Sequence, residues 1–129
     1  MMWMSPLFRR NEEKAARKAA ARVEIERLRA LPSDELAEDL FPALGPDGPT
    51  HGASVRTQQL CEYLLRDFPG AGQMDTLNLM AAVNRALDML EAVGLVSPIS
   101  VQRTPNWKIT SLGESALAEG NVRARVRRS

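Results

Sequence analysis

The sequence predicts a mostly α-helical protein with one small β-hairpin, preceded by a long N-terminal helix. Three observations support this class. Only 5% of the 129 residues are aromatic and alanine is plentiful, so we expect an aliphatic core built mainly from helices. Apolar residues recur at helical spacing along much of the chain. Their period changes to that of a strand only after Gly94.

The first predicted element is a helix from about Arg9 to Ala30. This segment is rich in alanine, lacks proline and glycine, and places Glu13 four residues before Arg17, the order that favours a helical ion pair. Its apolar stripe is broad but shallow, so we expect it to pack weakly or to stand alone. Residues 1–31 hold eight basic and four acidic residues and are predicted to form a basic helical extension.

Residues 32–52 are predicted to form a short helix followed by a loop. Pro32 ends the first helix, and Ser33 can cap a helix that reaches about Phe41. Three prolines and three glycines lie within residues 42–52, which predicts a mobile loop.

Two further helices are predicted before the strands. Ser54 can cap the first, from Val55 to Phe68, which a Pro-Gly-Ala-Gly sequence then ends. Asp75 can cap the second, a longer helix that ends near Val93 and has one apolar face.

The change of period predicts a helix end followed by a hairpin. Gly94 lies where a helix C-terminus needs a residue that tolerates the left-handed conformation, and β-branched residues follow it. Pro98 cannot donate to a ladder, so we expect the first strand at a sheet edge. Residues 102–106 have turn chemistry, and residues 107–110 alternate as a half-buried return strand.

A last helix and a basic tail complete the prediction. Ser111 and Glu114 have the spacing of a capping box, which starts a helix that ends near Gly120. Residues 121–129 carry four arginines with little apolar content, which predicts a disordered basic tail.

The pattern L-x-x-L-E-x-x-G-L-V from Leu87 to Val96, followed by W-K-I-T-x-x-G from Trp107 to Gly113, resembles the second half of a bacterial winged helix-turn-helix domain. MarR-like and PadR-like regulators contain such domains. The resemblance implies a winged-helix domain at residues 53–120, with a recognition helix followed by a two-stranded wing. It also implies a small cytoplasmic transcription regulator that binds duplex DNA as a homodimer.

Nucleic-acid contacts are expected from the long helix, the hairpin and the tail. Asn and Arg side chains bind adenine and guanine edges bidentately, and cations in a wing bind phosphates. Arginines in a tail add sequence-independent, salt-dependent affinity. The predicted nucleic-acid-binding residues are Asn78 and Arg85 in the long helix, Arg103 and Lys108 in the hairpin, and Arg123 and Arg125 in the tail.

Two features of the long helix keep a second interpretation open. Residues 74–93 hold one arginine against three carboxylates, a balance that repels a phosphate backbone. The interval from Phe68 to Val96 is also short for a second helix, a turn and a recognition helix, so the turn is expected to be compressed or lost. The alternative is a winged helix that binds a protein partner through this acidic face or through Asp34 to Asp39.

Other classes of function find less support. Met1 to Phe8 could rest on an anionic membrane surface, but no apolar run approaches the roughly 20 residues that span a bilayer. Cys61 is the only cysteine, which excludes an internal disulfide and suits a reducing cytoplasm. His51 is the only histidine and has no acid or nucleophile grouped with it in the sequence, so we expect no catalytic, metal or cofactor site.

Overall fold

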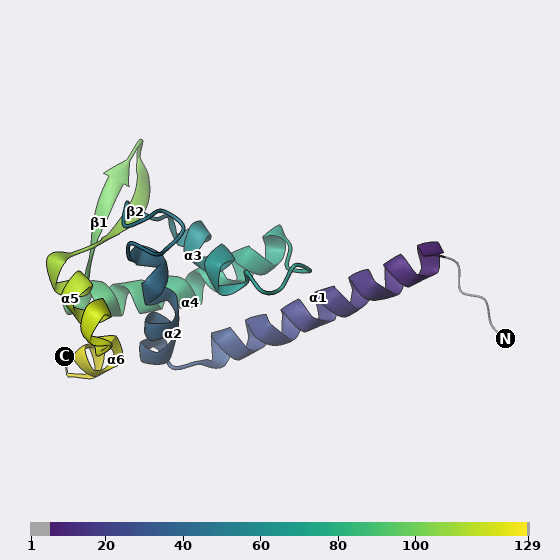
Figure 1. Ribbon diagram of the computed structural model, residues 1–129, viewed down its shortest axis with the longest axis horizontal. Helices are drawn as coiled ribbons and strands as arrows, with labels where there is room; N and C mark the ends of the chain where they lie inside the picture. The colour runs from purple at the N-terminus through teal and green to yellow at the C-terminus, as the bar shows by residue number, and fades with distance from the viewer. Residues whose placement is uncertain (1–5, 129) are drawn as a thin grey trace.

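The computed structural model describes residues 6–128, with side chains from residue 9 onward, as a helical body with one antiparallel hairpin (Figure 1). In chain order the elements are α1 (Pro6–Ala30), α2 (Ser33–Leu40), the 3-10 helix η1 (Phe41–Leu44), α3 (Thr57–Leu64), α4 (Gln73–Ala92), β1 (Val96–Val101), β2 (Thr104–Ile109), α5 (Ser111–Glu119) and α6 (Val122–Arg127). The predicted class, mostly α with a small hairpin after a long N-terminal helix, is confirmed. The idea that Met1 to Phe8 rest on a membrane surface concerns side chains outside the described ones.

α1 buries side chains only along its C-terminal half, although the backbone of Arg17 also lies against Gly70. Ala21, Ile25 and Leu28 are buried, whereas residues 9–20 are all exposed. Figure 1 shows the N-terminal half of α1 extending away from the other elements. The shallow stripe explains this arrangement, because a face made mostly of alanine gains little hydrophobic free energy from burial. Among the described residues, no helix is long and apolar enough to cross a membrane.

One aliphatic core joins the elements from α1 to α6. Its fully buried large side chains include Leu28, Leu36, Leu40, Phe41, Leu44, Leu60, Leu79, Leu87, Leu90 and Leu95. Since α2 and η1 contribute to the same core as the later helices, the domain boundaries predicted at residues 31 and 53 do not divide it. The segments are therefore parts of one folded unit.

Residues 42–53 comprise most of η1 and a series of hydrogen-bonded turns, where composition predicted a mobile loop. The amides of Gly45, Gly48 and His51 each donate to the carbonyl three positions earlier, over 3.0–3.2 Å. A Cβ on Gly48 would collide with the backbone of Ala43, so only glycine permits this close approach. Backbone satisfaction and close packing give the segment a defined shape.

The starts of α3 and α4 differ from the predicted caps. Val55, predicted as a helical residue, is extended and exchanges two backbone hydrogen bonds with Trp107, so α3 begins only at Thr57. Ser54 therefore caps no helix. Asp75 does accept a hydrogen bond at the start of α4, from the Gly72 N–H over 2.8 Å, but from inside the first turn.

The hairpin turns more tightly than predicted. Val101 pairs with Thr104, which leaves a two-residue turn at Gln102 and Arg103, with φ of 50° and 67°. Positive φ at both central positions is the geometry whose twist matches that of the flanking strands. The remaining predicted turn residues, 104–106, belong to β2.

Two prolines lie where they block the outer edges of the hairpin. Trp107 directs its backbone polar groups to Val55, so its partner across the hairpin, Pro98, directs its own groups away from β2. Pro98 therefore leaves the outer edge of β1 without a donor there, in agreement with the predicted edge strand. Pro105, two residues before Trp107, does the same on the outer edge of β2.

Two glycines mark helix ends as predicted. Gly94 has a φ of 78° just past α4, and Gly120 has a φ of 69° just past α5. The cap of α5 is Thr110 and not the predicted Ser111: its hydroxyl accepts from the Gly113 N–H over 3.0 Å and donates to the Gly94 carbonyl over 2.6 Å. One side chain thus joins the end of α4 to the start of α5.

The predicted disordered tail over residues 121–129 is wrong for its described part. Residues 122–127 form α6, which packs against α2. Val122 and Val126, four residues apart, are 5% and 2% exposed and belong to the core. Composition did not reveal this because the two valines are separated by Arg123, which pairs with α2, and Arg125, which pairs with Glu119 of α5.

Candidate nucleic-acid interface

One long face of α4 is open to solvent, and we call it the exposed α4 face: Met74, Leu77, Asn78, Ala81, Arg85 and Asp88. The predicted base-reading residues Asn78 and Arg85 both lie on it. Met74 and Leu77 are 69% and 50% exposed, which makes the N-terminal half of this face apolar around the Asn78 amide. Helical spacing brings these side chains into one stripe.

The C-terminal half of the same face is acidic. Asp88 and Glu91 are exposed, and within the described residues Arg85 forms no ion pair with either of them. Arg85 is the only cation of α4. The exposed α4 face thus changes along its length from apolar and amide-bearing to negatively charged.

The other two residues predicted to bind nucleic acid and not in α6, Arg103 and Lys108, lie at opposite ends of the hairpin. Arg103 is exposed at the tip, where its left-handed backbone belongs to the two-residue turn. Lys108 is exposed near the base of the hairpin, opposite Ser97. In Figure 1 the hairpin projects from the body at the C-terminal end of α4. Arg103 is therefore displayed on a projection, whereas Lys108 lies close to the body.

A chain of side-chain hydrogen bonds connects the hairpin to α3 and α4. The Trp107 indole N–H donates to the Thr57 hydroxyl over 3.3 Å, and that hydroxyl donates to Asn84 Oδ1 over 3.3 Å. These bonds hold the three elements in one relative orientation. Sequence reasoning missed Thr57 and Asn84. A buried indole does require an acceptor, but nothing local indicates which residue supplies it.

The two predicted contacts in α6 are engaged with carboxylates of the same molecule. Arg123 donates to Glu35 over 2.6 Å and to Asp34 over 3.4 Å. Arg125 donates to Glu119 over 3.0 Å. Neither guanidinium is therefore an unpaired cation on a free tail.

Asp34 is the centre of this ion-pair network. It also accepts a hydrogen bond from Arg127 over 2.6 Å. That bond, followed by the attraction of Arg127 and the contact with Arg123, holds the pKa of the Asp34 carboxyl below its ordinary value. Two carboxylates of α2, Asp34 and Glu35, and two arginines of α6, Arg123 and Arg127, therefore neutralise each other.

Side chains with potential for chemistry are dispersed over the described part of the chain. There, no three His, Cys, Asp or Glu residues cluster as a metal site. Burial raises the pKa of the Cys61 thiol to about 12, so the thiolate is scarce at neutral pH. His51 is exposed in the turn segment.

Searches of protein-family models, of curated proteins and of solved structures found no match to this chain.

Proposed function

We propose that this chain is a winged-helix protein that binds duplex DNA and regulates transcription. The observation that carries the proposal is the order of its elements. A helix (α2), an extended bridge at Val55, two helices (α3 and α4) and a hairpin follow one another, and the bridge pairs with β2 to extend the hairpin. This is the arrangement expected of a winged helix, with α4 as recognition helix and the hairpin as wing.

This assignment also accounts for the interval that looked too short in the sequence. The second helix is α3, which ends at Leu64, and residues 65–72 form the connection to α4. The first helix is α2, upstream of the boundary predicted at residue 53. On this assignment neither a helix nor a turn is missing, because the domain begins about 20 residues earlier than expected.

The proposed DNA contacts are made by polar and charged side chains that are exposed on α4 and on the hairpin. Asn78 and Arg85 would reach base edges in the major groove, where amide and guanidinium groups pair bidentately. Arg103 at the wing tip would bind a phosphate, and Lys108 a second one nearer the body. The bonds from Trp107 to Thr57 and Asn84 would keep the wing and the recognition helix in a constant relation.

A homodimer in the cytoplasm completes the proposal. α1 is the better candidate for the contact between subunits, because its outer side is open and Val23 is 68% exposed. α6 is less suited, since its apolar side is already buried against α2. Equilibrium sedimentation of the wild-type chain and of Val23→Asp tests this part: a dimer that persists in the variant would exclude a contact through Val23.

DNA binding is tested by fluorescence anisotropy with random-sequence duplexes in a salt series, followed by selection of preferred sequences. Arg103→Ala should lower the salt slope by about 1 without changing sequence preference. Arg85→Ala should weaken binding to a selected sequence by about 1–3 kcal/mol relative to random duplexes. Arg128→Ala, which removes an exposed cation at the end of α6, is the matched control. No binding at low salt, or equal losses in all three variants, would contradict the proposal.

Binding of a protein partner is the second candidate, and the composition of the exposed α4 face favours it. Exposed Met74 and Leu77 near the start of α4 form an apolar patch, and Asp88 and Glu91 near its end form an acidic one, which together suit a partner with apolar and basic groups. Absence of DNA binding, together with a co-purifying protein that the double charge reversal of Asp88 and Glu91 releases, would favour this function over the first.

A further inference from the structure

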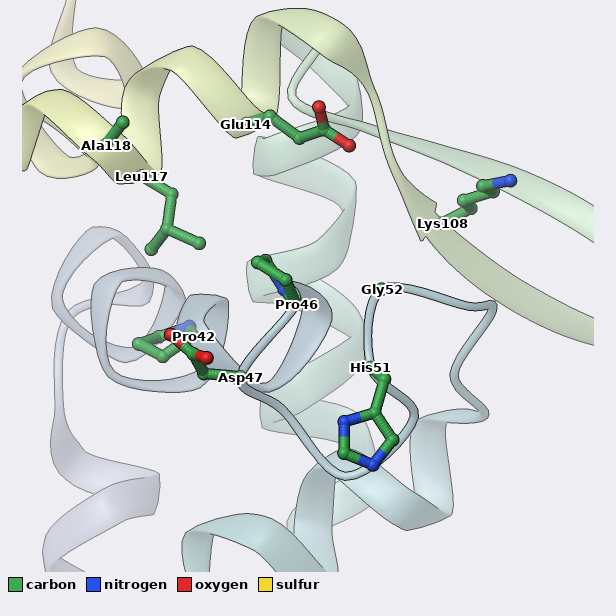
Figure 2. Close-up of a pocket in the computed structure, with 9 residues that line it drawn as sticks. All are labelled: Pro42, Pro46, Asp47, His51, Gly52, Lys108, Glu114, Leu117 and Ala118. Atoms are coloured by element: carbon green, nitrogen blue, oxygen red, sulfur yellow. The ribbon is translucent and has the colours of Figure 1, made fainter.

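A half-open cavity of about 780 Å³ lies between three segments that are far apart in the sequence. Figure 2 shows the turn segment on one side, α5 on another, and β2 at the edge. Pro42, Pro46, Leu117 and Ala118 supply apolar lining, and Asp47, His51, Lys108 and Glu114 supply polar groups. Its volume falls within the range of pockets that hold small molecules.

The turn segment gives this cavity a preformed wall. The successive turns described above determine the path of residues 42–53. A Cβ on Gly45 would meet the end of the Leu117 side chain, so glycine lets that side chain pack directly against the segment. Gly52 adopts a φ of 87°, and His51, although not a glycine, adopts a φ of 51°. The wall is therefore built by specific backbone geometry.

The polar groups around the cavity are not used by the protein itself. Within the described residues, the side chains of Asp47, His51, Lys108 and Glu114 form no hydrogen bond or ion pair. With histidine counted as neutral, the lining carries two negative charges and one positive charge. A preformed apolar cavity with a net negative rim is complementary to a ligand that has an apolar body and a cationic group.

We propose that this cavity binds a small organic cation, an amine with an aliphatic or aromatic body. The body lies against Pro42, Pro46 and Leu117, and the ammonium group pairs with Glu114 or Asp47. Lys108 disfavours a second cationic group at the β2 edge. This assignment goes beyond DNA binding and does not depend on it.

The charge sign of the ligand is tested with two matched probes. We would titrate the isotope-labelled full-length chain, without DNA, with 2-phenylethylammonium and separately with 3-phenylpropionate, and follow methyl and amide NMR signals. The ammonium should shift the signals of Leu117, Ala118 and Gly52 saturably, and the carboxylate should bind about 5-fold more weakly or not at all, given the size of partly exposed charge interactions. Equal binding of the two probes, or no saturable shift at these residues, would overturn the proposal.

Two variants test the place of binding. The double variant Asp47→Asn with Glu114→Gln should weaken binding of the ammonium about 5-fold or more, because two partly exposed charge interactions are lost. Its fold should persist, since neither carboxylate has a partner in the described structure. Glu12→Gln on the exposed half of α1 is the matched control and should leave binding unchanged.

Ala118→Arg gives an independent test, because it fills the cavity and adds a positive charge at an exposed helical position. It should abolish the saturable shifts while the remaining spectrum stays dispersed. Wild-type affinity in Ala118→Arg or in the double variant would show that the amine binds elsewhere and would overturn the proposal.

Discussion

The two basic ends of this chain look alike in sequence and differ in structure. α1 exposes the cations of residues 9–18 on a helix half that buries no side chain, although Arg17 lies against Gly70. α6 inserts two valines into the core, and its arginines pair with the carboxylates of α2 and α5. A run of cations is therefore available to a partner only where no acidic helix docks beside it.

The largest difference between the two ends should appear when a valine of each is replaced by aspartate. Val126→Asp places a charge in the core and should lower the free energy of unfolding by about 3 kcal/mol or more. Val23→Asp lies on a surface that is exposed in the single chain, and at a protein concentration at which the chain is monomeric it should change the free energy of unfolding by no more than about 0.5 kcal/mol. Urea unfolding followed by circular dichroism measures both. Equal losses would mean that α6 is not docked or that α1 is covered in solution.

Limited trypsin digestion should separate the two ends next. Cleavage needs local opening, and the exposed half of α1 has no buried side chain to release, whereas α6 must leave the core. Each 1.4 kcal/mol of additional opening free energy slows cleavage tenfold, so residues 9–18 should be cut at least about tenfold faster than residues 123–127. Mass spectrometry of early time points gives the two rates. Faster loss of α6 would refute its docking.

A smaller effect is expected when the carboxylate between α2 and α6 is neutralised. Asp34→Asn weakens the bonds from both Arg123 and Arg127, so the urea midpoint should fall and α6 should become more sensitive to trypsin. Glu13→Gln, on the exposed half of α1, should leave both measurements unchanged. If the two variants behave alike, the ion pairs of α6 contribute no more to stability than an exposed charge does.

The smallest expected effect is a pH dependence of stability that comes from the ion pairs between α2 and α6. Because Arg127 lowers the pKa of Asp34 in the folded protein, this group stabilises the fold fully above its unfolded pKa of about 3.9. The contribution declines as the pH falls below that value and is lost once the pH passes the lower folded pKa. Subtracting the unfolding curve of Asp34→Asn from that of the wild type, between pH 7 and pH 3, isolates it. A difference that grows toward low pH would have the wrong sign.

Sequence by itself determined the local elements of this protein. The apolar period of α4, the left-handed glycines at 94 and 120, and the edge role of Pro98 were all predicted, and the structure has them. Each depends on contacts within a few residues or on the covalent nature of one residue, so neighbouring positions carry enough information. For the candidate interface, the same reasoning placed Asn78 and Arg85 on one exposed helix face.

Only the tertiary structure determined which polar and charged side chains pair with residues far away in the sequence. Trp107 donates to Thr57, 50 positions away, and Arg123 pairs with Asp34, 89 positions away. The first contact helps to hold the hairpin against α3 and α4. The second engages an arginine that was predicted from the sequence to bind DNA. Hydrogen bonds and ion pairs form only over short distances, so the packing of the helices determines which charged side chains remain unpaired. That packing depends on side chains from every part of the core.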